Sequence, residues 1–242
     1  MHRLLFVCLF FSLFGAAKLQ ADVVRFGYNQ NHFAPIVIRD DNFIAVSGII
    51  FDLANVIANE AGYMPKLFSI PRKRIEQYLV DGKVDAKCHS NPVWYTHPSI
   101  VWSPVVYQDS DVIVTKKHYE SIEHLAATPP FKIGTVLGYK YPELDDYFKR
   151  GEIKRFDSTS SNGSFARFIR GELDGFVSAY TEANYLTQLD RFHVININEN
   201  NIYCAFSPKL DKEKLQKLLN AITRLKAQGE FQRVLAKYIK SS

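Results

Sequence analysis

The segment Val23–Tyr28 (VVRFGY) alternates apolar and polar residues, which predicts the first β-strand of the fold. A helix beginning at Gly48 comes next, because apolar residues recur at helical spacing until Gly62 ends the pattern. The alternation of strand and helix continues outward, with a strand at 66–70, a helix at 72–80 and a strand beginning at 84. Such an order predicts a parallel sheet with helices on its faces.

A second series of the same kind follows a strand at 105–115. It has strands at 131–136, 155–157, 173–177 and 192–196, helices at 143–149, 165–171 and 180–189, and a helical tail at 209–239 that Gly229 interrupts. We therefore expect an α/β protein with two lobes, each a mostly parallel sheet flanked by helices. The expected limits are 22–107 for the first part of lobe 1, 108–204 for lobe 2 and 205–242 for the C-terminal helical part of lobe 1. The hinge is expected at 107–110 and 201–206.

Residues 1–21 have the pattern of a secretory signal peptide. Arg3 supplies the positive start, an apolar run extends from Leu4 to Phe14, and small residues precede Asp22. The apolar run is about half the ~20 residues that span a bilayer, which favours export over a retained anchor. Loss of the segment lowers the net charge from +5 to +3, an ordinary value that gives no argument for nucleic acid. We expect a chain that is soluble after signal cleavage.

Composition and motifs exclude several other classes. Charged residues make up 23% and aromatic residues 14% of the chain, which excludes a disordered protein. Only Cys88 and Cys204 remain after export, and the sequence leaves open whether they pair. The sequence has no Cys-x-x-Cys motif, zinc-binding histidine pair, phosphate loop or nucleophile elbow. We therefore expect no catalytic residues, no metal and no cofactor.

Several short motifs follow one another in a distinctive order along the mature chain. They are Phe33-Ala34-Pro35, Gly48–Leu53, Leu79–Ala86, Trp102–Tyr107, Ile133–Tyr139, Gly171–Gly175, Ala205–Lys209 and Leu225–Phe231. In this order, behind a signal peptide, they resemble the extracellular solute-binding proteins of family 3, the amino-acid type that serves ABC transporters. The resemblance covers essentially the whole mature chain. It implies the two-lobed type II periplasmic binding fold, a ligand held between the lobes and a location in the bacterial periplasm.

Two positions depart from the pattern that this resemblance implies. Family members typically hold the ligand's carboxylate with an arginine just after the third strand, but residues 88–98 contain neither arginine nor acid. Members also usually offer a second-lobe aspartate to the ligand's ammonium, and Ala179 or Tyr180 stands nearest that place. Glu182 is an alternative source of the negative charge. Because a bidentate arginine is hard to replace, we expect a divergent branch in which ordinary α-amino acids bind poorly.

Replacement contacts are predicted around the expected cleft. Arg72 or Arg74 could bind an anionic group, with a solvated basic helix start as the alternative. Aromatic rings, Tyr95 among them, could stack on a flat or cationic ligand, with core packing as the alternative. Ser90 and Asn91 could form hydrogen bonds at the strand end. The candidate ligand-binding residues are Phe33, Arg72, Arg74, Ser90, Asn91, Trp94, Gly138, Tyr139 and Tyr180.

These features predict a monomeric periplasmic solute-binding protein that is not an enzyme. It would capture a small polar or aromatic molecule between its lobes, with an ABC permease as its partner in import and no nucleic-acid partner. Two alternatives stay open at this point. One is a periplasmic module that senses a ligand for a membrane receptor, and the other is an enzyme on the same scaffold, such as a dehydratase.

Overall fold

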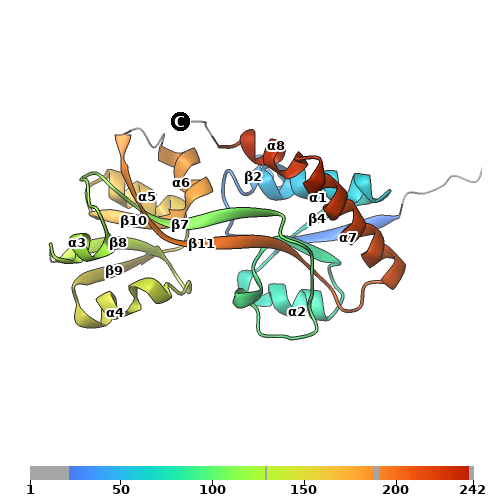
Figure 1. Ribbon diagram of the computed structural model, residues 1–242, viewed down its shortest axis with the longest axis horizontal. Helices are drawn as coiled ribbons and strands as arrows, with labels where there is room; N and C mark the ends of the chain where they lie inside the picture. The colour runs from blue at the N-terminus through green and yellow to red at the C-terminus, as the bar shows by residue number, and fades with distance from the viewer. Residues whose placement is uncertain (1–21, 129, 188–190, 240–242) are drawn as a thin grey trace, which may run out of the picture.

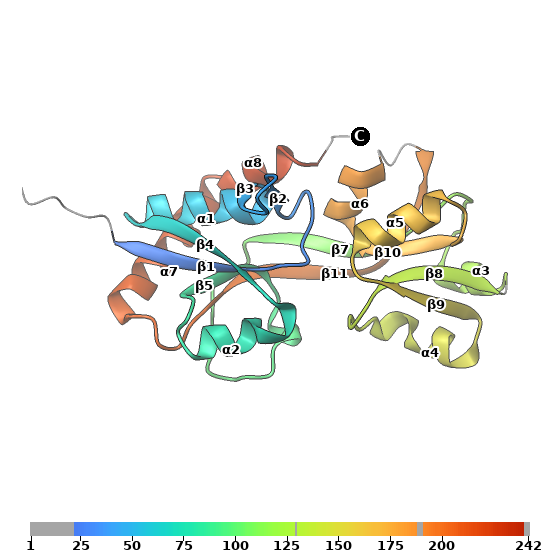
Figure 2. The ribbon, with the colours of Figure 1, turned by 180° about the vertical axis from the view of Figure 1, so that it is seen from behind.

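The computed structural model describes residues 22–128, 130–187 and 191–239, so the predicted signal peptide lies outside the described residues. Two lobes lie side by side along the long axis of the molecule, and strands join them through the middle (Figures 1 and 2). Each lobe has its own buried apolar residues, for example Leu53 and Phe231 in lobe 1 and Ile133 and Leu144 in lobe 2. Within the described residues, no helix is both long enough and apolar enough to cross a membrane.

Lobe 1 is built on three parallel strands, with β1 (Val23–Asn29) between β4 (Met64–Ile70) and β5 (Ala86–Ser90). Its helices are α1 (Ile49–Glu60), α2 (Ile75–Val80), α7 (Lys212–Ala227) and α8 (Glu230–Ala236). Helices α1, α7 and α8 lie on one side of these strands and α2 on the other (Figure 1). The apolar stripe of α1 that the sequence predicts is buried, and Gly62 takes the left-handed conformation (φ 83°) just after the helix.

Lobe 2 has the same construction. Strand β8 (Phe131–Val136) lies between its parallel neighbours β9 (Ile153–Ser158) and β10 (Gly175–Ala179). The helices of this lobe are α3 (Ile122–Ala126), α4 (Pro142–Arg150), α5 (Ser161–Ile169) and α6 (Tyr180–Thr187). Figure 2 shows α5 and α6 on one side of the strands and α4 on the other. The predicted α/β fold, with a mostly parallel sheet in each lobe, is confirmed.

Two long antiparallel strands, β7 (Tyr107–Thr115) and β11 (His193–Phe206), connect the lobes (Figure 1). The sheet order is β4-β1-β5-β11-β7-β10-β8-β9, and the short β6 (Val101–Trp102) pairs with β11. Strand β11 pairs with β5 in lobe 1, whereas β7 pairs with β10 in lobe 2. Because β7 and β11 run through both lobes, the residue limits expected for each lobe stay a prediction.

Some elements differ from the sequence-based expectation. The hairpin of β2 (Ile38–Arg39) and β3 (Ala45–Ser47) was not predicted, because such short strands show no alternation. Strand β11 continues well past residue 196, through a polar segment that is largely half-exposed and therefore lacks the usual apolar pattern. Helix α5 begins at Ser161, before the predicted start at 165, because the Ser160 hydroxyl accepts a hydrogen bond from the N–H of Gly163 and caps the helix.

Cys88 on β5 and Cys204 on β11 form a disulfide, which settles the question that the sequence left open. Both residues are buried, and their sequence separation is 116. The bond ties the returning strand of the chain to the first part of lobe 1, so that the enclosed loop contains β8, β9 and β10. Removing a native disulfide typically costs about 2–5 kcal/mol of stability.

Candidate ligand-binding site between the lobes

The carboxyl ends of the parallel strands in the two lobes meet at the junction between the lobes. Arg72 follows β4 in lobe 1, and Tyr139 follows β8 in lobe 2. The guanidinium carbon of Arg72 lies 3.7 Å from the centre of the Tyr139 ring, a cation–π contact. Gly138 (φ 76°) lies beside this contact, because a Cβ atom built on Gly138 would be 3.6 Å from Nη1 of Arg72. We call these strand ends, together with the start of β7, the inter-lobe site.

Aromatic and imidazole rings gather on the lobe-1 side of this site. The ring of His89, at the end of β5, lies 5.3 Å from His32, 6.3 Å from Trp94 and 6.2 Å from Tyr107, measured between ring centres. Nδ1 of His89 is 2.5 Å from the Tyr107 hydroxyl. Burial lowers the pKa of His89 to about 3 and holds the pKa of His32 well below its ordinary value. Both histidines are therefore neutral at neutral pH.

Lys87 is a buried cation at the same strand end. Its Nζ donates hydrogen bonds to the carbonyl oxygens of Cys88 (3.3 Å) and His89 (2.7 Å) and to Oγ of Ser90 (2.9 Å). All three donors of the ammonium are thus used by the three residues that follow it. Burial, and then the like charge of Arg72, lower the pKa of Lys87 to about 7.

Carboxylates form the lobe-2 side of the site. Oδ1 of Asp109, on β7, accepts hydrogen bonds from the N–H groups of Ser110 (2.9 Å) and Thr181 (3.2 Å), while Oδ2 is buried without a partner. Oε2 of Glu182, in the first turn of α6, accepts hydrogen bonds from the hydroxyls of Ser161 (2.8 Å) and Ser178 (3.2 Å). Burial is the main cause that raises the pKa of Asp109 to about 6 and that of Glu182 to about 7, and repulsion between neighbouring carboxylates adds to it.

The positive and negative groups of the two sides are not neutralised by each other. Within the described residues, no ion pair includes Arg72, Lys87, Asp109 or Glu182. Two tyrosine side chains respond to these groups. The pKa of Tyr107 is raised by burial and then by Asp109 and Glu182. Burial also raises the pKa of Tyr139, while Arg72 lowers it and Glu182 raises it.

Three other predicted site residues follow β5 and lie beside His89. Ser90 is fully buried, and its hydroxyl is 3.0 Å from the Tyr95 hydroxyl. The Asn91 side chain accepts a hydrogen bond from the N–H of Val93 and donates to the carbonyl oxygen of Asn201, which ties this strand end to β11. Trp94 is 51% exposed, at the end of the short 3-10 helix η2 (Pro92–Trp94). Ser90 and Asn91 therefore form hydrogen bonds within the protein that stabilise this strand end, whereas the Trp94 ring is half exposed to solvent.

Phe33, Arg74 and Tyr180 are not brought into this group of contacts. Arg74 is exposed in the 3-10 helix η1 (Arg72–Arg74), and within the described chain its guanidinium has no hydrogen-bond, ion-pair or ring partner. Tyr180 packs against the core of lobe 2, and Phe33 is 41% exposed. Of the two arginines proposed to bind an anion, the structure brings only Arg72 to the junction.

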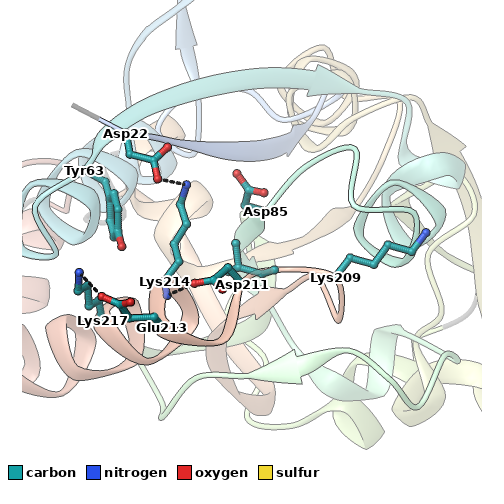
Figure 3. A pocket seen from close by; sticks show the side chains of 9 residues that line it. Asp22, Tyr63, Asp85, Lys209, Asp211, Glu213, Lys214 and Lys217 are labelled. Carbon is teal, nitrogen blue, oxygen red and sulfur yellow. Dashed lines mark hydrogen bonds and ion pairs between the residues drawn. The ribbon is translucent and has the colours of Figure 1, made fainter. Parts of the chain in front are cut away.

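A separate pocket of about 530 Å³ lies at the opposite, amino-terminal end of β1 (Figure 3). We call it the α7 pocket, because the first turn of α7 forms one wall. Its charged side chains are already paired within the protein, through Lys214–Asp22 (3.3 Å), Lys217–Glu213 (2.8 Å) and Asp85–Arg25 (2.5 Å). Asp211 caps α7 by accepting the N–H of Lys214. Because its charges have partners, this pocket is a weaker candidate for ligand binding than the inter-lobe site.

Comparison with known proteins agrees with the architecture of the two lobes. Residues 24–241 match the family described as bacterial extracellular solute-binding proteins, family 3. The chain belongs to this family. The resemblance predicted from the sequence motifs is therefore confirmed. No curated protein matches the chain in sequence.

Solved structures of solute-binding proteins share this fold. An ancestral cationic amino acid solute-binding protein superposes with a TM-score of 0.74 at 21% identity, covering 90% of this chain and 96% of that one. An ancestral arginine-binding protein bound to arginine gives 0.70 at 20% identity, with coverages of 90% and 98%. The second substrate-binding domain of Lactococcus lactis GlnP, in an open conformation, gives 0.66 at 19% identity, with coverages of 94% and 100%. At such identities the likeness establishes the two-lobed fold.

Two of the charged residues at the inter-lobe site of this solute-binding protein stand at positions that the sequence analysis did not identify. Lys87 lies inside β5 and Asp109 inside β7, whereas the sequence analysis sought charges just after the third strand, at Arg72 and Arg74, and at residues 179–182. A signal was present for Lys87, a charged residue between the apolar Ala86 and Cys88, whereas Asp109 lies in the polar stretch 108–111, which gives no such signal. A buried charge in such a strand is costly unless a partner compensates it, which makes it a candidate for function.

Proposed function

We propose that this chain is a periplasmic solute-binding protein that captures a small polar or aromatic molecule in the inter-lobe site and delivers it to an ABC-type importer. The observation that carries the proposal is a set of charged groups without ionic partners in the described chain at the strand ends of the two lobes, namely buried Lys87, half-buried Asp109 with its buried Oδ2 atom, and half-buried Glu182. In open α/β sheets, ligands bind outside the carboxyl ends of the strands. The similar structures that bind arginine or cationic amino acids support solute capture without deciding which solute this chain takes.

The two connecting strands supply the means of capture. Among the strands of the described residues, only β7 and β11 pass between the lobes, so the lobes can rotate about these two strands while each core stays packed. Arg72 and Tyr139 approach each other across the junction and would shield a bound solute from water. Release to a permease would require these contacts to open again.

A binding experiment tests the proposal even while the solute is unidentified. The purified mature protein is heated with and without a small-molecule extract of the cells that make it, and mass spectrometry identifies any molecule that remains bound after gel filtration. A bound solute raises the apparent melting temperature by mass action. Cells that lack the protein should then lose uptake of that solute. If no fraction of the extract stabilises the protein, solute capture is wrong.

Glu182 supports an enzyme as a second candidate. Its pKa of about 7 allows a carboxyl group to exchange a proton near neutral pH, as a general acid or base does. Incubation of the identified solute with the protein decides between the candidates. Recovery of the solute unchanged after prolonged incubation supports capture. Conversion that stops in the Glu182→Gln variant would support an enzyme, such as a dehydratase, instead.

A further inference from the structure

Strands β2 and β3 are joined by a turn whose backbone is fixed by Asp40. The N–H of Asp40 donates to the carbonyl oxygen of Ile44 (3.0 Å), and its carbonyl oxygen accepts the N–H of Phe43 (3.0 Å). Its Oδ1 accepts the N–H groups of Asn42 (3.0 Å) and Ile44 (2.9 Å). These hydrogen bonds hold Phe43 in the left-handed conformation (φ 61°). Asp40 and the backbone therefore set the shape of the turn, and the Phe43 ring is not needed for it.

Phenylalanine is an unusual residue at this position of the turn. Glycine and asparagine adopt the left-handed conformation readily, whereas the Cβ atom of most other residues crowds the following carbonyl oxygen. In the described chain, His89 (φ 56°) is the only other non-glycine residue with a positive φ, and it lies in the inter-lobe site. Backbone conformations of this kind cluster at functional sites. The conformation of Phe43 therefore indicates a function for its side chain.

Exposed apolar side chains extend from this turn into β3. The exposed fraction is 82% for Phe43, 60% for Ile44 and 47% for Val46, and in the described chain none of the three packs against a buried apolar cluster. Ala45, which stands among them, is buried in the core of lobe 1. A single exposed apolar residue is ordinary, but adjacent ones that form a patch are typical of an interaction site. We call Phe43, Ile44 and Val46 the hairpin surface.

Two carboxylates border the hairpin surface. Asp40 and Asp41 are exposed, and no ion pair of the described residues includes either of them. The neighbouring guanidinium of Arg39 donates instead to the carbonyl oxygens of His32 (2.5 Å) and Gln30 (2.9 Å). The tip of the hairpin thus combines apolar side chains with negative charge. Such a surface complements an apolar recess bordered by basic side chains.

Lobe 1 holds the base of the hairpin at both strands. Next to β3, Oγ of Ser47 lies 3.1 Å from the Tyr238 hydroxyl, which also accepts the N–H of Gly48 (3.0 Å), and Figure 2 shows the hairpin beside α8. At β2, Arg39 ties the hairpin to the segment that carries His32, a residue of the inter-lobe site. A partner bound to the hairpin surface would therefore be fixed to the part of lobe 1 that contributes to the solute site.

We propose that the hairpin surface docks this protein on the membrane-spanning subunit of its importer, in an apolar recess bordered by basic side chains. The proposal rests on the import proposed above. Three side chains offer less area than the ~800 Å² per partner of a stable interface, which suits a contact that must form and release. A second copy of this chain is disfavoured because the acidic tips would repel each other, and anionic lipid headgroups would repel the same carboxylates.

Cross-linking in living cells tests this contact without knowledge of the solute. The photoreactive residue p-benzoylphenylalanine replaces Phe43 in the full chain, and in a control protein it replaces Met64, an exposed apolar residue at the start of β4. After irradiation, mass spectrometry identifies the adduct. We expect a membrane-spanning subunit of an ABC importer at position 43 and none at position 64. No adduct at position 43, or an adduct with lipid, with a second copy of this chain or with any other protein, would overturn the proposal.

Two charge variants of the cross-linking protein test the acidic border. Asp41→Lys should lower the yield of the adduct at least fivefold, because a lysine would repel the basic side chains expected around the recess. Asp146→Lys makes the same change at an exposed carboxylate of α4 in lobe 2 and should leave the yield unchanged. Equal yields from the two variants would show that the position of the charge does not matter and would refute the acidic border.

Thermal unfolding separates docking from a structural role of the ring. Phe43→Asn introduces a residue that tolerates the left-handed conformation, so its melting temperature should equal or exceed that of the wild type. A melting temperature several degrees below that of the wild type would show that the ring stabilises the fold, and the proposal would fail.

These outcomes are distinct from failure of the proposed function. If the cell extract yields a bound solute whose uptake depends on this protein, but position 43 gives no importer adduct, capture and import stand and the hairpin surface is wrong. If no molecule of the extract stabilises the protein, capture is wrong whatever position 43 contacts.

Discussion

The α7 pocket and the inter-lobe site both collect charged side chains, but they differ in how the charges are compensated. In the pocket, Lys214 and Lys217 each have a carboxylate within 3.3 Å. In the inter-lobe site, cations and carboxylates stand on separate sides and no ion pair joins them in the described chain. Buried charge that the protein leaves uncompensated favours the inter-lobe site, because such charge is costly unless an external partner supplies the opposite sign.

The largest effect is expected in the α7 pocket, where most of the charged side chains have ionic partners. Asp85 is buried, and its carboxylate accepts hydrogen bonds from the backbone N–H and the guanidinium of Arg25. Asp85→Asn should lower the free energy of unfolding by about 3 kcal/mol, because the buried side chain loses its charge and an amide cannot accept all of these hydrogen bonds. Urea denaturation at neutral pH measures the loss. A stability equal to that of the wild type would mean that the paired charges of the pocket contribute little.

Glu182 has no ionic partner within the described residues, so its ionisation is expected to destabilise the folded protein, whereas the ionised Asp85 stabilises it. The folded-state pKa of Glu182 is raised from 4.5 to about 7, so the folded protein favours its neutral form. This contribution to stability is fully present below pH 4.5 and is lost as the pH rises through about 7. Glu182→Gln should therefore remove about 2 kcal/mol of the decrease in unfolding free energy between pH 4.5 and 7, measured on the ligand-free protein.

Comparing the wild type with Glu182→Gln over the same pH range separates the effect of Glu182 from that of other titrating groups. Lys87, with a pKa of about 7, remains mostly protonated through this range and contributes little to the difference. Asp109 contributes to the decrease in both proteins, because its pKa is raised to about 6. Parallel stability curves for the wild type and Glu182→Gln would show that folding does not raise the pKa of Glu182, contrary to our expectation.

A smaller effect is expected from substitutions that alter solute binding. Arg72→Ala should weaken binding of the natural solute about tenfold, equivalent to ~1.4 kcal/mol, because the contact with Tyr139 and the free N–H groups are both lost. Trp94→Ala should cost less, since this ring is half-exposed. Arg74→Ala is a control in the same 3-10 helix, and the structure predicts little change. Isothermal titration of the three variants measures these affinities. Unchanged affinity in all of them would exclude this side of the junction from the binding site.

The smallest effect concerns an exposed pair at the edge of the α7 pocket. Lys217 lies 2.8 Å from Glu213 one helical turn away, and both side chains are more than half exposed. Lys217→Ala should leave the free energy of unfolding unchanged within the error of urea denaturation and should leave solute binding unaffected. A clear loss of solute binding in this variant would show that the ligand binds in the α7 pocket and not between the lobes.

Local pattern was enough to predict the fold. The spacing of apolar residues in α1 and the glycines at 62, 171 and 229 identified helices and their ends, and the strand–helix order predicted two lobes. The elements that escaped prediction were short or polar, as in the β2–β3 hairpin and the middle of β11. Pairing with a partner strand stabilises such segments, and a single sequence does not display that pairing.

The candidate site was predicted only in part. Arg72, Gly138 and Tyr139 were expected near the ligand, and the structure brings them together. Lys87 and Asp109 were missed because their sequence neighbourhoods resemble ordinary strands. Arg74 was included because the sequence of a basic cluster is the same whether or not the cluster contacts the other lobe. The position of a charge along the chain does not reveal whether folding will bring a counterion to it.

The family, the two α/β lobes and the approximate positions of most helices follow from the amino-acid sequence alone, since these depend on periodicity and on residues a few positions apart. Tertiary packing was needed to establish that Cys88 pairs with Cys204, that Arg72 stacks on Tyr139, and that no ion pair joins Lys87 to the carboxylates of β7 and α6 in the described chain. Burial and the distance between charges set these properties. Burial and charge separation are set when the fold brings strand ends that are far apart in the chain to one junction. A local sequence pattern does not show which strand ends will meet.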